Sequence, residues 1–519
     1  MSEPLPNSPI MLGAPSLRRS IAGPTAGGFG RKGGNARLLT GICSSSVLLV
    51  LLAGCKPVGP NYNRPAYQAP TAYKEATAAS LAGGVGWQTA VPSDSQLRGK
   101  WWEIYQDPQL NKLEERISPS NQTLRAALES YLAAHEQIKA ARASLYPTLS
   151  AGPALSRNTL STNSYSYSSS KPTSYGDFQI EGQASWEPDF WGRIRRSAEA
   201  ARESAQASAA DLATLDLSLH AELAQDYFAL RGLSSQSSLL QSTVADYEHQ
   251  LDLTQRRRAG GIGTEVDVAQ ANTQLETVRA QLIDIEQARA QYEHAIATLA
   301  NLPAGELSLA TAPLHHETLP QVPVGLPSQL VERRPDIAAA ERRVAAANAQ
   351  IGIAVSAYYP TITLGAAGGF ESTNAGTWIQ GPSSLWSLGA QASELLFDAG
   401  RRHALTDQAR HNYEAQAATY RATVLGAFNE VEDRLSDLRV LNNELAAERK
   451  AVAAAQHSLD ISNQRYKGGA ASYLEVLIAE STLLTNQRTE ADLESRQFAA
   501  SVQLVRALGG GWDSRQLPK

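Results

Sequence analysis

The stretch "QRYKGGAASYLEVL", Gln464 to Leu477, interrupts a long run of helix-favouring residues. The flanking segments 401–467 and 470–508 contain no proline and, between them, a single glycine. Glycine commonly ends helices because it adopts the left-handed backbone conformation at low cost. Two helices joined by a short Gly-rich turn pack as an antiparallel hairpin. The stretch therefore predicts the tip of a long helical hairpin.

The same pattern occurs earlier, in "RRRAGGIGTEVDVAQA", residues 256–271. Gly260 there corresponds to Gly468, and Asp267 to Glu475, both at a spacing of 208 positions (468 − 260). The motifs "FWGRIRRS" and "FDAGRRHA" keep that spacing, and "ASLYPTLSAGPA" is similar to "SAYYPTITLGAA". A period of about 200 residues is that of a duplicated domain, not of a short solenoid repeat. We therefore expect an internal duplication with two hairpin tips.

Each copy is expected to contain a helix, a β segment and two further helices. The predicted helices, with the first copy before the second, are 121–145 and 336–358, 193–258 and 401–467, and 264–302 and 470–508. Apolar residues along the longest of them recur every three or four positions, which is the pattern that packs helix against helix in coiled coils. A helix of about 66 residues is about 100 Å long, which is too long for one compact domain.

The segment "DFQIEGQASWE", Asp177 to Glu187, alternates apolar and polar residues. Strict alternation over about ten residues is typical of a strand with one lipid-facing and one water-facing side. The segment "LWSLGAQASELLF", residues 385–397, repeats the alternation more weakly. The alternative is a strand of a soluble sandwich, but four strands per chain are too few for one. They are also too few to close a barrel, unless several chains contribute.

The N-terminal region contains "RKGGNARLLTGICSSSVLLVLLAGC", in which basic residues precede a short apolar run, Leu38 to Leu52. This order predicts an export signal. The run ends in Leu-Ala-Gly-Cys55, which resembles a bacterial lipobox, so Cys55 is expected to carry a diacylglycerol and an N-acyl lipid. The alternative is a signal peptide with a chance cysteine. Lys56 follows, where an Asp would favour the inner membrane, so we expect the outer membrane.

No other apolar run approaches the length of about 20 residues that a spanning helix needs. A mature chain that crosses a membrane would then have to do so as a closed β-barrel.

Composition and short motifs give no support for several classes of function. The formal net charge of −5 gives no reason to expect a nucleic-acid partner. The two cysteines, Cys43 and Cys55, both lie near the N-terminus, so neither a disulfide framework nor a zinc site is expected downstream. His135-Glu136 lacks the second histidine of a zinc-protease motif, and His315-His316 has no ligands nearby. With no cluster of nucleophile, base and oxyanion donor, we expect neither an enzyme nor a cofactor other than lipid.

Several long motifs occur in an order that resembles a known family. They are "CKPVGPNYNRP", "WWEIYQDPQLNKLEERI", "VPVGLPSQLVERRPDIAAAERRVAAANAQIGIAVSAYYPTITL" and "FDAGRR". Together they resemble the TolC-like outer-membrane factors, in particular the lipoprotein branch of NodT-type efflux proteins, over about Cys55 to Gly510. The resemblance implies a mixed, mainly α fold with long coiled-coil hairpins and four transmembrane strands per protomer. In a homotrimer these would form a twelve-stranded β-barrel continuous with a twelve-helix α-barrel.

The implied function is the outer-membrane channel of a tripartite, RND-type efflux system. The resemblance implies export of small molecules such as drugs, with a periplasmic adaptor (membrane fusion) protein and an inner-membrane transporter as partners. The channel would be lipid-anchored in the outer membrane and extend into the periplasm. Two alternatives remain: a type I secretion duct, and a coiled-coil lipoprotein scaffold without a channel. The alternating segment 177–187 argues against the scaffold.

The resemblance also implies gate residues at the hairpin tips. Tyr466 matches the family's gate tyrosine, and Glu475 matches an acidic position after the tip, with Asp267 as its counterpart in the first copy. In a trimer the two acids would give six carboxylates near the constriction, and charged rings select ions by sign. Relatives often carry a further acid where this chain has Ile478 and Gln270, so a second acidic ring is not expected. The alternative for each acid is a solvated charge at a helix end.

The tip glycines are expected to permit close docking of the adaptor, or simply to form the turns. They are Gly260, Gly261, Gly263, Gly468 and Gly469. A basic tip residue of some relatives is replaced by Ala471, for which Arg465 and Lys467 would substitute only weakly. Arg256, Arg257 and Arg258 are interpreted as a solvated or adaptor-facing surface rather than a lock.

These patterns divide the chain into six parts. The expected boundaries are 1–54 for the signal peptide with its lipobox, 55–105 for the lipidated segment, 106–313 for the first repeat, 314–334 for the linker and equatorial belt, 335–511 for the second repeat, and 512–519 for the C-terminal tail.

Overall fold

The computed structural model describes residues 56–518, apart from residues 68, 76–86, 90–98, 160, 164–173, 311, 315–317 and 325–331. The predicted export signal and the predicted lipid site Cys55 lie outside these residues, as do His315 and His316. The described residues from Lys56 onward belong to one compact unit.

Both halves of the chain contain the same elements in the same order. The first half contains α4 (Gln122–Ala143), β2 (Thr148–Thr159), β3 (Ser174–Trp186), α5 (Arg193–Ala259) and α6 (Glu265–Leu299), and the second contains α8 (Pro335–Ser356), β5 (Thr361–Ser372), β6 (Ser384–Ser393), α9 (Arg401–Lys467) and α10 (Tyr473–Ala507). The helices α5 and α9 have 67 residues each, and α6 and α10 have 35 each. The predicted helices and strands are confirmed to within a few residues, and the repeated order agrees with a duplication.

Several short elements before the first repeat, at its start and in the linker were not predicted. They are the 3-10 helix η2 (Trp101–Tyr105), the helix α3 (Pro108–Ser120), and the strands β1 (Trp87–Thr89) and β4 (Val322–Val324), which pair in parallel. Strands β1 and β4 lie far apart in sequence. A local sequence pattern therefore cannot predict that they pair. Pairing between them ties the N-terminal segment to the linker between the repeats.

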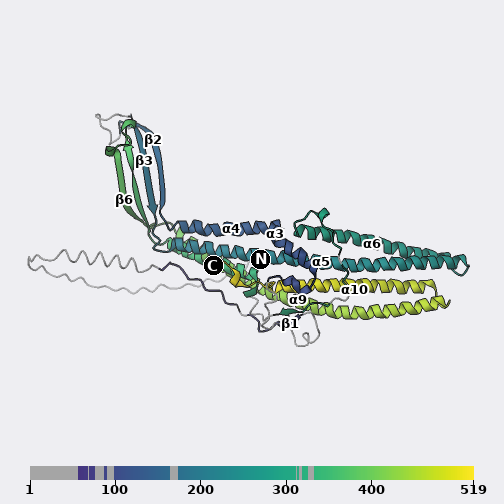
Figure 1. Cartoon of the computed structure of the whole chain (residues 1–519). Helices are drawn as coiled ribbons and strands as arrows, with labels where there is room; N and C mark the ends of the chain where they lie inside the picture. The colour runs from purple at the N-terminus through teal and green to yellow at the C-terminus, as the bar shows by residue number, and fades with distance from the viewer. Residues whose placement is uncertain are drawn as a thin grey trace, which may run out of the picture. The chain divides into compact units, whose positions relative to one another are not determined.

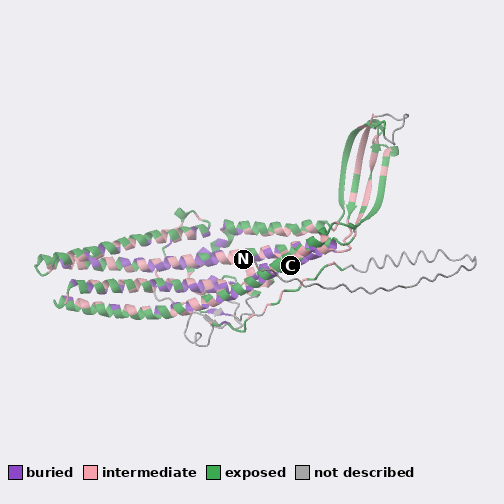
Figure 2. Ribbon diagram, turned by 180° about the vertical axis from the view of Figure 1, so that it is seen from behind, coloured by how far each residue is buried: buried purple, intermediate pink, exposed green. Residues whose placement is uncertain are grey.

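The long helices form two antiparallel hairpins, α5 with α6 and α9 with α10 (Figure 1). The predicted apolar stripes are their buried faces, which Figure 2 shows in purple along the facing sides. On α5 the stripe contains Leu219, Leu223 and Leu230, and on α9 it contains Val431 and Leu435, all buried. Helix α5 also contacts α10 along the seam between the hairpins. Among the described helices, none combines the length and apolar character needed to cross a bilayer.

The four long strands form one antiparallel sheet in the order β2-β3-β5-β6. Side chains that lie opposite one another in paired strands share a face of the sheet. The register aligns Leu149 with Ala184, Ala184 with Ala366, and Ala366 with Leu388. The larger apolar side chains Leu149, Ile180, Leu364 and Leu388 therefore lie on one face, one from each strand. The polar side chains Gln179, Glu181, Gln183, Glu371 and Gln391 lie on the other.

The apolar face of the sheet is not covered by the described residues. Leu149, Trp386 and Leu388 are each more than three-quarters exposed, with 81%, 79% and 78% of their surface accessible. The predicted alternation is therefore confirmed, and its apolar side faces the surroundings of the chain. Strands β2 and β6 form the two edges of this sheet.

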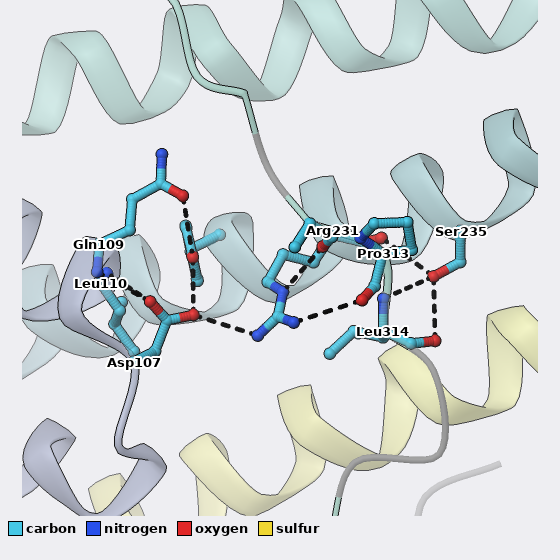
Figure 3. A network of polar contacts seen from close by, with 9 residues as sticks. Asp107, Gln109, Leu110, Arg231, Ser235, Pro313 and Leu314 are labelled. Atoms are coloured by element: carbon cyan, nitrogen blue, oxygen red, sulfur yellow. Dashed lines mark hydrogen bonds and ion pairs between the residues drawn. The ribbon is translucent and has the colours of Figure 1, made fainter.

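A buried network joins α3 to α5, as Figure 3 shows. Asp107 begins α3 by accepting hydrogen bonds from the backbone N–H groups of Gln109 and Leu110, at 2.8 and 3.1 Å. Its other carboxylate oxygen accepts from the Tyr227 hydroxyl at 2.7 Å and from the Arg231 guanidinium at 3.1 Å. The carboxylate thus caps one helix and pairs with a cation on another.

The same arginine binds the linker between the repeats. Arg231 donates to the carbonyl oxygens of Ala312 and Pro313, at 3.0 and 3.4 Å. Ser235, one turn further along α5, donates to the Leu314 carbonyl at 3.1 Å and accepts from the Leu314 N–H at 2.7 Å (Figure 3). The start of the linker is therefore fixed to α5 by backbone contacts, which residue type alone does not reveal.

Replacing Arg231 by methionine is expected to lower the free energy of unfolding by about 3 kcal/mol, because it removes the cationic partner of a largely buried carboxyl group. Denaturant unfolding of the detergent-solubilised protein measures this change. The matched control is Arg256→Met, since Arg256 pairs with Asp252 at 2.8 Å with both side chains exposed. That change is expected to cost less than about 1 kcal/mol. Equal effects of the two substitutions would contradict the assigned role of the buried pair.

Candidate functional site at the hairpin tips

Both tips have the same backbone structure. Gly261 and Gly469 have φ values of +78° and +73°, in the left-handed region. At the first tip the Ile262 N–H donates to the Arg257 carbonyl at 2.9 Å, and the equivalent bond from the Ala470 N–H measures 2.8 Å. A left-handed glycine with this hydrogen bond is the Schellman motif that ends helices. The duplicated sequence thus produces two equal turns.

The remaining tip glycines differ in how strictly the turn requires them. Gly260 and Gly468 are the helix C-caps, with φ of −79° and −78°, a conformation that any residue adopts. A Cβ on Gly263 would lie 3.1 Å from the Arg258 backbone nitrogen, so a side chain there would be tight. The turn conformation therefore favours glycine at positions 261 and 469. It does not require glycine at positions 260 and 468.

The two acidic positions have different local roles. Asp267 forms a capping box with Thr264: its carboxylate accepts from the Thr264 N–H at 2.9 Å, and its own N–H donates to the Thr264 hydroxyl at 3.2 Å. Glu475 instead pairs with Arg465 at 3.2 Å, with both side chains about half exposed. A capping box stabilises the helix start, whereas an exposed ion pair contributes little. Asp267 is thus partly committed to capping α6, and Glu475 is more accessible.

Tyr466 lies between the two hairpins. Only 7% of its surface is exposed, and it packs with Ala271 of α6 and with Tyr473 and Val476 of α10. The Arg257 guanidinium of α5 lies over the Tyr466 ring, 4.4 Å from its centroid, in a cation–π contact. Arg257, interpreted above as part of a solvated or adaptor-facing surface, is partly buried and also contacts the other hairpin. Sequence spacing could not reveal this contact, because Arg257 and Tyr466 belong to different hairpins.

Apolar side chains are exposed at both tips, and sequence reasoning did not identify them as a set. Ile262 and Val266 of the first hairpin are 75% and 62% exposed, and Leu474 and Ile478 of the second are 47% and 59% exposed. Ile478 occupies the position where relatives were expected to carry an acid. The tips therefore present apolar contacts beside the half-exposed Glu475.

The segment directly after Cys55 packs where α5 begins, shortly after β3. The Val58 N–H donates to the Trp191 carbonyl at 2.9 Å. Gly192 has a φ of +82°, and a Cβ there would lie 2.5 Å from Pro57. Arg196 donates to the Val58 carbonyl at 3.2 Å. This end of the described chain is therefore held close to the sheet, at the opposite end of α5 from the tip.

A buried histidine on α5 has neighbours in the order of a catalytic triad. The His220 Nε2 lies 3.2 Å from the Ser118 hydroxyl, and its Nδ1 lies 2.6 Å from the Glu114 carboxylate. Asp216 is also near, at 3.5 Å. Burial lowers the pKa of His220, but hydrogen bonds to Asp216 and Glu114 outweigh it and raise the pKa to about 9. The contacts with Ser118 and Glu114 both join a side chain of α3 to His220 of α5, so this cluster fastens α3 to α5.

No cluster of histidine, cysteine and carboxylate side chains among the described residues has the arrangement of a metal site. A groove of about 810 Å³ lies where α3 and α4 meet α5 and the C-terminal segment. Its lining includes Arg125, Glu129 and Trp512, which do not form a cluster of catalytic groups. The tips remain the candidate site.

Comparison with known proteins gives a consistent result. The family model described as "Outer membrane efflux protein" matches residues 115–302 and 326–510, together more than half of the chain. The pyoverdine export outer membrane protein OpmQ of Pseudomonas aeruginosa is 34% identical over 426 residues, which cover 81% of this chain and 89% of that protein. The antibiotic efflux pump outer membrane protein ArpC of Pseudomonas putida is 30% identical, over 91% of this chain and 96% of its own.

The fold is also similar to a solved structure. The outer-membrane channel OprN superposes with a TM-score of 0.80 and 28% sequence identity, covering 88% of this chain and 99% of that one. The likeness therefore extends over the sheet and both hairpins.

Gly469→Ala is expected to loosen the second tip, because a left-handed alanine costs about 1–2 kcal/mol. Hydrogen exchange of the tip amides in the purified full-length protein measures this as faster exchange at residues 469 and 470. Gly468→Ala is the matched control, because its φ of −78° suits alanine, and exchange should stay close to wild type. Faster exchange in the control alone would contradict the assigned turn.

Proposed function

The chain belongs to the outer membrane efflux protein family, and from this membership we propose how its sheet, hairpins and tips work. It is an outer-membrane channel component of an efflux system. The observation that supports a channel most directly is the strand register, which places one continuous apolar face on a sheet with two free edges. Such edges need partners, and an apolar face needs lipid.

We propose that three copies assemble. Edge strand β2 of one protomer would pair with β6 of the next, so three four-stranded sheets would close into one barrel of twelve strands. The hairpins would continue from this barrel as a helical tunnel. A helix of 67 residues is about 100 Å long, a length suited to crossing the periplasm.

The proposed cargo is a set of small molecules such as drugs or other toxic compounds. The names of OpmQ and ArpC refer to export of pyoverdine and of antibiotics, and both proteins match this chain over most of their length. Protein secretion of type I is the alternative, and no contact described above favours it. A periplasmic adaptor and an inner-membrane transporter of RND type would complete the pump.

We propose that the tips form both the gate and the adaptor-docking surface. Asp267 and Glu475 would line the constriction, while the buried Tyr466 and the overlying Arg257 fasten one hairpin to the other. Opening would then require the hairpins to move apart at this contact. The adaptor would dock on the glycine turns and on exposed apolar side chains such as Ile262.

The proposed lipid anchor is Cys55. Support comes from the next residues, because Pro57 and Val58 pack against Trp191 and Gly192, close to the end of β3. A lipid attached just before them would be placed at the membrane-proximal end of the helices. One acyl anchor adds to the barrel's own membrane contact and does not replace it.

The channel proposal is tested by conductance of purified trimers in planar bilayers. The wild type is expected to show a small, cation-preferring conductance that divalent cations block. Asp267→Asn combined with Glu475→Gln should raise the conductance several-fold and remove the block, because the charge disappears while the side-chain shape stays. Glu286→Gln removes an exposed carboxylate further along α6 and should behave as wild type. Absence of conductance from verified trimers of both forms would overturn the channel proposal.

The lipid anchor is tested by the intact mass of the mature protein. We expect cleavage before Cys55 and a mass increase equal to a diacylglycerol and an acyl chain, and Cys55→Ser should abolish both. An unmodified mature mass in the wild type would show that the cysteine is not lipidated.

A further inference from the structure

The seam between the two hairpins contains an acidic side chain that the gate proposal does not use. Helix α10 runs beside α5 along this seam. Near the tip, Val476 of α10 belongs to the apolar cluster around Tyr466. Further from the tip, Leu484 of α10 packs on a second apolar cluster that contains Tyr247 of α5. Glu480 lies one helical turn from each of Val476 and Leu484, so it sits between two apolar contacts.

The Glu480 carboxyl is poorly compensated. Its Oε2 atom is buried, with no hydrogen-bond partner among the described residues. Burial raises the pKa of Glu480 most, and the negative charge of Asp246 on α5 raises it further, to about 7. The charged group that acts on the Glu480 carboxyl, Asp246, is therefore also an acid. An ionised carboxylate in such a place is unfavourable.

The groups that interact electrostatically with the tyrosines of this part of the seam are other tyrosines and acids. Burial and then Glu480 raise the pKa of Tyr247 on α5 and of Tyr473 on α10. Tyr466 of α9 and Asp267 of α6 act on Tyr473 in the same direction. The cation Arg257 lies over the Tyr466 ring nearer the tip, and it is not among the groups that shift the pKa of Glu480.

The acidic pair occurs at one of the two equivalent places in the duplicated chain. The residue that corresponds to Glu480 in the first repeat is Asn272 (480 − 208), and the residue that corresponds to Asp246 in the second repeat is Ala454 (246 + 208). The pair therefore belongs to the contact between α5 and α10 and is not a general feature of the hairpins. An amide at the equivalent position indicates that the helix itself does not need an acid there.

We propose that Glu480 is a pH-sensitive latch, which holds α10 against α5 when protonated and loosens the seam when ionised. The latch lies on the same seam as the contact between Arg257 and Tyr466, so a looser seam favours separation of the tips. This inference rests on the proposed gate at the tips for its effect on conductance. Its effect on the seam itself does not depend on the gate.

The direction of the pH effect follows from linkage. A carboxyl whose pKa is raised by packing is stabilised there in its protonated form. The protonated latch is fully effective below the ordinary carboxyl pKa of 4.5, weakens as the pH rises, and is lost above about 7. Acid conditions therefore favour packed hairpins, and neutral to alkaline conditions favour their separation.

The test measures the distance across the seam in the full-length trimer. Spin labels are attached at Ala245→Cys on α5 and Ser481→Cys on α10, both exposed positions, and singly labelled proteins give the background. Between about pH 5 and about pH 8 the wild-type distance distribution is expected to shift to longer values and broaden. Glu480→Gln, which has the shape of the protonated acid, should keep the short distance throughout. Asp246→Asn should move the midpoint to lower pH, because it removes the negative neighbour.

Glu286→Gln is the matched control and should keep the wild-type pH dependence. A wild-type distance that does not change with pH, or a Glu480→Gln protein that still responds, would overturn the latch. Conductance of the same trimers separates the two proposals. A seam that responds to pH in protein without conductance would leave the latch standing and overturn the channel, whereas a conducting trimer with a pH-independent seam would overturn the latch alone.

Discussion

Packing of apolar stripes along two very long helices is the constraint on which the rest of the structure depends. A helix of 67 residues has no compact shape of its own, so α5 and α9 each need a partner along their length. The stripe on α5 passes from α6 to the seam with α10 and to the shorter helices α3, α4 and α8. Near its middle, Phe228 packs between Tyr105 and Phe498, and these three rings join η2, α5 and α10. The short elements take their positions from this core.

Polar groups buried beside that core determine how the segments outside the repeats attach. Asp107 caps α3 and pairs with Arg231, and Arg231 in turn binds the linker, so one ion pair connects three parts of the chain. His220 performs a comparable task between α5 and α3, with Trp102 stacked on its ring at 4.5 Å. Buried pairs of this kind add little net stability over apolar packing, but they select one arrangement of the segments.

The duplication produced equal backbones with different side chains, and the differences lie where function is proposed. The two tips share their turns, yet Asp267 caps its helix and Glu475 pairs with an exposed arginine. Further along the seam, Glu480 stands where the first repeat has Asn272. The turns of the two hairpins are similar, whereas the contact between the hairpins contains Glu480, which has no acidic counterpart in the first repeat. In the proposed latch, movement between the hairpins would respond to the charge of Glu480 without any change within each hairpin.

The sequence by itself determined the features that depend on neighbouring residues in the chain. Helix bounds follow from apolar spacing and from glycine, the second tip follows from the adjacent glycines Gly468 and Gly469, and the face of each strand follows from alternation. Only the tertiary structure decided which distant groups meet. Arg257 lies over Tyr466, Arg231 pairs with Asp107, and the charge of Asp246 acts on Glu480. In each pair more than a hundred positions separate the two residues. A side chain's charge and size are written in the sequence, but its surroundings depend on packing between helices that no local pattern specifies.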